Sequence, residues 1–78
     1  MAVGAYILIQ TDVGQASDVT ARVRRLPGVS LADAITGPYD VIARAETDTI
    51  DSLGRFVVSQ VQPIDGVTRT LTCPIVAL

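Results

Sequence analysis

The sequence predicts an α+β fold in which a four-stranded antiparallel sheet carries two helices on one face. Runs of β-branched and other apolar residues alternate with two segments of helical spacing, in the order strand, helix, strand, strand, helix, strand. The two halves of the chain also share a layout, because each helical segment ends near a Pro and a Gly that lead into another strand. This order and this repetition predict a βαββαβ unit.

The first strand is predicted over residues 2–10, where the sequence is almost continuously apolar. Such a run is typical of a strand that is covered on both faces. The first helix is predicted over residues 15–26, because apolar side chains recur there at the spacing of one helical stripe. Pro27 and Gly28 end it.

Residues 29–36 and 39–46 are predicted to form two strands that meet at the turn Thr36-Gly37-Pro38-Tyr39-Asp40. Gly adopts backbone angles that other residues avoid, and Pro fixes its own φ and removes a hydrogen-bond donor. A hairpin with a loop of a few residues is therefore expected at the middle of the chain.

The second helix is predicted to begin near Thr47, interpreted as its N-cap, with Ile50, Leu53, Val57 and Val61 as its buried stripe. Gly54, which is unfavourable inside a helix, is explained by close packing of the helix on the sheet. The last strand is predicted over residues 67–76. Its Pro74 cannot donate to a neighbouring strand, which indicates a sheet edge.

The order βαββαβ is that of the ferredoxin-like sandwich. Two helices can cover only one face of its sheet, so the other face should be polar if it meets water. Strict alternation instead places apolar or small residues there: Tyr6, Leu8, Ala32, Ala34 and Ile42. Such a patch is unusual on a monomer. We therefore expect two copies to pack these faces together as a dimeric α+β barrel, with these residues at the dimer interface.

Length and composition bound the possible functions. With 78 residues, the chain is expected to form one domain, residues 1–78, with a small core. Cys73 is the only cysteine and there is no histidine, which excludes an internal disulfide and a histidine-containing metal site. No cofactor is predicted. Small domains without such a staple usually depend on a partner chain.

The charge of the chain gives no sign of direct nucleic-acid binding, because the net charge is −2 and the pI is about 4.6. No stretch approaches the ~20 apolar residues that cross a membrane, and the N-terminus lacks the basic start of a signal peptide. The single unpaired cysteine fits a reducing compartment. A cytoplasmic location is expected.

Catalytic groups are scarce, since a chain without histidine lacks the usual general base, and no enzymatic activity is predicted. Cys73 is interpreted as a small buried hydrophobe in a strand. Two interpretations of the central turn remain open on composition. In the first, Tyr39 and Asp40 act with Arg44 as a polar constellation. In the second, Tyr39 packs over the hairpin and Asp40 accepts hydrogen bonds from turn amides.

The stretch Thr36-Gly37-Pro38-Tyr39-Asp40-Val41-Ile42, with Pro27-Gly28-Val29 before it and Gly66-Val67-Thr68-Arg69-Thr70 and Thr72 after it, resembles the effector-binding half of the Lrp/AsnC (feast/famine) regulators. This half is also called the RAM domain, for regulation of amino-acid metabolism. The resemblance covers essentially the whole chain. It implies a βαββαβ domain that dimerises sheet to sheet, assembles into octamers or related rings, and binds small effectors, typically amino acids.

The resemblance also implies which residues bind the effector. Gly37, Pro38 and Tyr39 would offer backbone groups and shape to the charged ends of an amino acid, and Asp40 would pair with its ammonium group. The full set of implied ligand-binding residues is Thr36, Gly37, Pro38, Tyr39, Asp40, Thr70 and Thr72, the two threonines as hydroxyl partners.

Full-length members of that family carry an N-terminal helix-turn-helix, and this sequence begins directly at the first strand, so a stand-alone domain is expected. Its regulatory role would then run through co-assembly with full-length Lrp/AsnC relatives or through another partner. Two alternatives are kept: an enzyme of the dimeric α+β barrel kind, resembling small monooxygenases or isomerases, and a purely structural assembly subunit.

Overall fold

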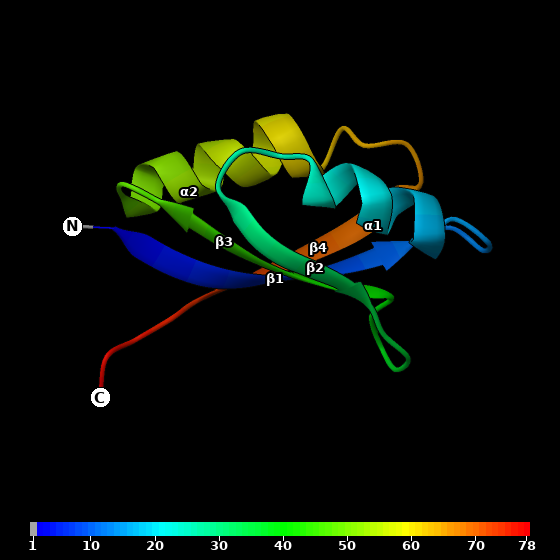
Figure 1. Cartoon of the computed structure of the whole chain (residues 1–78), viewed down its shortest axis with the longest axis horizontal. Helices are drawn as coiled ribbons and strands as arrows, with labels where there is room; N and C mark the ends of the chain where they lie inside the picture. Colours follow the sequence, from blue (N-terminus) through cyan, green and yellow to red (C-terminus); the bar gives the residue numbers. More distant parts are fainter. Residues whose placement is uncertain (1) are drawn as a thin grey trace.

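A computed structural model describes residues 2–78 and contains the predicted elements in the predicted order (Figure 1). The elements are β1 (Val3–Thr11), α1 (Ala16–Arg24), β2 (Val29–Ala34), β3 (Val41–Thr47), α2 (Ile50–Phe56), η1 (Val57–Val61) and β4 (Val67–Pro74). The π-helical segment η1 directly continues α2, and the N–H of Gln62 donates to the carbonyl oxygen of Val57 at 2.9 Å. The fold is thus of the ferredoxin-like α+β type.

The four strands form one antiparallel sheet in the order β2-β3-β1-β4. Both helices lie against the same face of this sheet (Figure 1). β1 and β3 are the central strands, and β2 and β4 are the edges. Pro74 is the last residue of an edge strand, as its missing donor predicted.

The core lies between the sheet and the helices. The two central strands contribute the buried residues Ile7, Ile9, Val41, Ala43 and Ala45, and the helical segments contribute Val19, Val23, Val57 and Val61. Small alanines on β3 leave room for the helices to approach the sheet. Leu53 is also buried, but Ile50, predicted in the same stripe, is 58% exposed, so that assignment was wrong.

The faces predicted for Ala32 and Ala34 are also wrong. The register between β2 and β3 shifts between Val29 and Leu31, because these residues pair with the adjacent residues Ala45 and Arg44. Such a bulge reverses the alternation of side chains after it. Ala32 and Ala34 therefore lie on the helix side, opposite the buried Ala43 and Val41, and Ala32 itself is part of the core. Leu31 takes their place on the open face of the sheet.

The N-cap of the second helix lies two residues later than predicted. Thr49, not Thr47, is the N-cap: its side chain accepts a hydrogen bond from the N–H of Ser52, whose hydroxyl accepts one from the N–H of Thr49. Thr47 is the last residue of β3. The explanation offered for Gly54 was also wrong, because Gly54 is exposed and a Cβ atom built there meets nothing within 4 Å. Among residues 2–78, no helix is long and apolar enough to span a membrane.

Candidate functional site

The connection between β2 and β3, residues 35–40, is fixed against the end of β1. The N–H of Ile35 donates to the carbonyl oxygen of Asp40 at 2.9 Å, and the N–H of Asp40 donates to that of Ile9 at 2.9 Å. The side-chain amide of Gln10 reaches the carbonyl oxygen of Pro38 at 3.3 Å. This loop is therefore held by contacts from a neighbouring strand as well as by its own turn.

The side chain of Asp40 makes the shortest of the contacts that hold the loop. Its Oδ2 accepts a hydrogen bond from the N–H of Thr11 at 2.8 Å, in a partly buried position. The amide comes from β1 and not from the turn, which corrects the expected partner of the carboxylate. A carboxylate has two oxygens and about four lone-pair sites, so the bond to Thr11 leaves acceptor capacity for a cationic group.

The tip of the same loop is open. Thr36, Gly37 and Pro38 are exposed, and Tyr39 is half-buried. Gly37 has a φ of 139°, a conformation that L side chains rarely adopt, while nothing lies within 4 Å of a Cβ placed on it. Glycine is needed there for its backbone angles and not for lack of space. Backbone groups at this tip are accessible to a ligand or to another chain.

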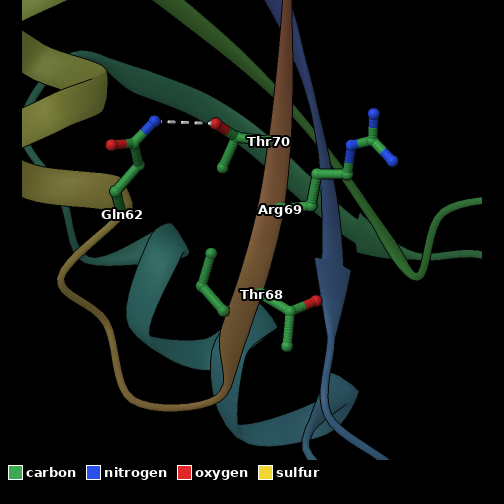
Figure 2. A pocket seen from close by; sticks show the side chains of 5 residues that line it. Gln62, Thr68, Arg69 and Thr70 are labelled. Atoms are coloured by element: carbon green, nitrogen blue, oxygen red, sulfur yellow. Dashed lines mark hydrogen bonds between the residues drawn. The ribbon is translucent and has the colours of Figure 1, made fainter.

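Thr70 and Thr72 lie elsewhere. They are on the edge strand β4, opposite Ile9 and Ile7 of β1, so β1 separates them from the hairpin strand β3. The side-chain amide of Gln62 donates to Thr70 Oγ1 at 3.1 Å, and Figure 2 shows the two facing each other while Arg69 points to the other side of the strand. Within one chain, the predicted ligand-binding residues therefore lie in two separate places, the loop of residues 35–40 and the edge strand β4.

A hollow of about 370 Å³ lies beside Thr70, lined by Gln62, Val67, Thr68, Arg69 and Thr70. Thr68 lies at an irregularity in the β1–β4 register, between Val67 and Arg69, and its hydroxyl donates to the carbonyl oxygen of Gln10 at 3.1 Å. Sequence reasoning missed Gln10 and Gln62. No local pattern marks either glutamine, because their roles follow from contacts with residues distant in the sequence.

The open face of the sheet carries the predicted interface residues Tyr6, Leu8 and Ile42, together with residues that the prediction left out. These are Leu31, Leu71 and Ile75, which are 41%, 45% and 42% exposed. Arg44 lies over the ring of Tyr6, with its guanidinium carbon 5.6 Å from the ring centroid. Cys73 pairs with Tyr6 on this face and is exposed, so its interpretation as a buried hydrophobe was wrong.

Comparison with known proteins places this geometry in a family. Residues 4–77 match the family model described as the Lrp/AsnC ligand binding domain. The uncharacterized HTH-type transcriptional regulator PH1916 of Pyrococcus horikoshii is 28% identical over 71 residues, which cover 87% of this chain and 47% of the relative. The chain thus spans about half the length of this curated relative.

Two solved structures share the fold. That of FFRP-DM1 has a TM-score of 0.89 at 30% identity, over 95% of this chain and 99% of its own. The transcriptional regulator NMB0573 of Neisseria meningitidis, solved as an L-Met complex, has a TM-score of 0.85 at 22% identity, over 96% of this chain and 50% of its own. Because the family model covers nearly the whole sequence, the chain belongs to the Lrp/AsnC ligand-binding domain family.

Proposed function

We propose that this chain is an oligomeric regulatory module of the Lrp/AsnC type that binds an amino acid as its effector. The family match over residues 4–77 and the regulator PH1916 support a ligand-binding role in transcriptional regulation. The L-Met complex of the neisserial regulator, which shares this fold, suggests amino acids as the chemical class. Direct DNA binding is not part of the proposal, because a net charge of −2 offers phosphates no attraction.

The observation that carries the proposal is the anchored loop with an open tip. Thr11 and Gln10 of β1 hold the loop through hydrogen bonds within the chain. The exposed backbone at Gly37 and Pro38 and the remaining oxygen of Asp40 then offer donors and acceptors of the kind that the two charged ends of an amino acid need.

The separation of Thr70 and Thr72 from the loop supports a site between two copies. If both sets of residues contact one effector, they come from different subunits, because β1 lies between them in a single chain. Binding would then be linked to assembly, since an effector that bridges subunits stabilises the assembled state. In this arrangement the number of subunits in the assembly would depend on the concentration of the amino acid.

The dimer in this proposal forms through the open sheet face, and dimers assemble further into a ring. The apolar residues Tyr6, Leu8, Leu31, Ile42 and Leu71 would be covered by the same face of a second copy. Full-length Lrp/AsnC regulators, which carry the same domain, are the proposed further partners. The proposed location is the cytoplasm.

Native mass spectrometry with a panel of amino acids tests the proposal. Even-numbered assemblies that gain one amino-acid mass per subunit, or change size with one amino acid, are expected. The variant Asp40→Asn keeps an oxygen that can accept the Thr11 N–H but loses the negative charge, so it should fold normally and bind the effector at least about tenfold more weakly.

Asp48→Asn is the matched control, because it removes an exposed carboxylate outside the loop. It is expected to bind the effector as the wild type does. A wild-type assembly that ignores every amino acid in the panel would refute the sensor function. Equal binding by Asp40→Asn and the wild type would refute the role of this carboxylate while leaving the function standing.

A further inference from the structure

Gly54 lies on the outer surface of α2, and the packing of a single copy does not explain it. Glycine weakens the interior of a helix relative to alanine. The position is exposed, it has no positive φ, and an added Cβ atom would meet no heavy atom within 4 Å. Neither the backbone conformation nor crowding in this chain therefore requires a glycine. A close approach from outside would require one.

The surroundings of Gly54 have the shape of a groove. Ile50 and Val58, four residues before and after it, are 58% and 62% exposed. Together with Gly54 they line a hollow of about 590 Å³ whose other walls are Asp51, Arg55 and Ser59. Two large apolar side chains with no side chain between them leave space for the ridge of another helix.

We propose that this groove docks the continuous helix α2–η1 of a second copy of the chain, with the two helices antiparallel about a two-fold axis near Gly54. In this arrangement Ile50 of each copy meets Val58 of the other, since both lie four residues from Gly54 in opposite directions. The two glycines face each other and let the backbones come close.

The charges along the groove argue for a second copy as the occupant. Asp51 and Arg55 line the same hollow, with the acid toward the start of α2 and the base toward its end. A two-fold axis reverses the helix direction but keeps this flank on the same side. Asp51 of each copy then lies within reach of Arg55 of the other, which makes the surface complementary to itself. Within residues 2–78, Asp51 and Arg55 form no ion pair of their own.

This contact is separate from the proposed function. α2 lies on the helix side of the molecule, and the open sheet face lies on the other side (Figure 1). The docking of α2 therefore requires neither the sheet-to-sheet dimer nor an amino acid. Two such isologous contacts on opposite sides of one chain build assemblies larger than a dimer.

Charge exchange between two variants tests the proposal by sedimentation velocity. Asp51→Arg places two cations on the flank, and Arg55→Asp places two anions there, so each variant alone should associate at least about tenfold more weakly than the wild type. An equimolar mixture of the two restores both opposite-charge pairs and should regain the wild-type assembly. Gly54→Gln fills the groove with a side chain and should weaken association similarly.

Circular dichroism checks that each variant is folded. The matched control is Asp48→Arg, which reverses the charge of an acidic residue outside the groove. If the sheet faces pair, the variants stop at dimers; if they do not, the variants are monomers where the wild type is a dimer. Both results support docking through α2. Variants that assemble like the wild type, a mixture that behaves like its separate components, or a wild-type monomer would overturn it.

Discussion

Asp40 shows how one residue of the hairpin can serve the fold while its carboxylate keeps further acceptor capacity. Sequence reasoning left two interpretations of its carboxylate open, a ligand contact and a bond to turn amides. In the structure Oδ2 accepts the N–H of Thr11, at the end of a neighbouring strand. No sequence pattern predicts that partner, because Thr11 and Asp40 are 29 residues apart and meet only when β1 pairs with β3.

Removing the Asp40 carboxylate should therefore destabilise the fold. Asp40→Ala leaves the partly buried N–H of Thr11 without its acceptor, and we expect the free energy of unfolding to fall by about 1–2 kcal/mol. Asp40→Asn keeps an acceptor oxygen and should lose less than half as much. Urea unfolding of both variants measures this. Equal losses in the two variants would show that the charge, and not the hydrogen bond, matters for stability.

At the scale of elements, the type and order of the helices and strands were predicted correctly. The face of the sheet that the side chains of β2 occupy was not. Apolar periodicity identified both helices and every strand, since the spacing of buried residues follows from helix and strand geometry. Strict alternation then failed in β2, because the extra residue near Ser30 moved Ala32 inward and Leu31 outward. A bulge depends on pairing with another strand, so a single strand's pattern does not reveal it.

The start of α2 could have been located from the sequence. Thr47 and Thr49 are both plausible N-caps, but only Thr49 has a hydroxyl residue three positions later, Ser52, that can return the hydrogen bond. Thr49→Ala should lower the free energy of unfolding by about 1 kcal/mol. Thr47→Ala, which removes one exposed bond to the carbonyl oxygen of Thr49, should cost clearly less. Thermal and urea unfolding compare them, and the reverse ranking would contradict this cap.

At the scale of the whole molecule, the two faces of the sheet differ in what covers them. The helices bury one face completely at its centre, where Ile7, Ile9 and Val41 are at most 1% exposed. The other face leaves Tyr6, Leu31 and Leu71 each more than a third exposed. The predicted ligand-binding residues are also separated in a single chain, because β1 lies between the loop of residues 35–40 and the threonines of β4. The sequence supplies these residues, and a single site that used both sets would need more than one subunit.

The correction in β2 gives a direct test of the dimer proposed for the open face. Leu31 and Ala34 are exposed residues of the same edge strand, but they lie on opposite faces of the sheet. Leu31→Lys places a charge among apolar residues that would be buried on dimerisation. The loss of roughly 1.5–3 kcal/mol of apolar burial corresponds to at least about a tenfold weaker dimer. Ala34→Lys adds the same charge on the helix side and should leave dimerisation unchanged.

Sedimentation equilibrium of the two variants measures the difference, with thermal unfolding to confirm that each is folded. Because Leu31 is 41% exposed, lysine there can extend into water in the monomer, and the fold should lose little stability. A dimer weakened by Leu31→Lys alone places the interface on the open face. A dimer weakened by Ala34→Lys alone would place the interface on the helix side. The proposed effector site between subunits would then have to involve the helix side of the sheet.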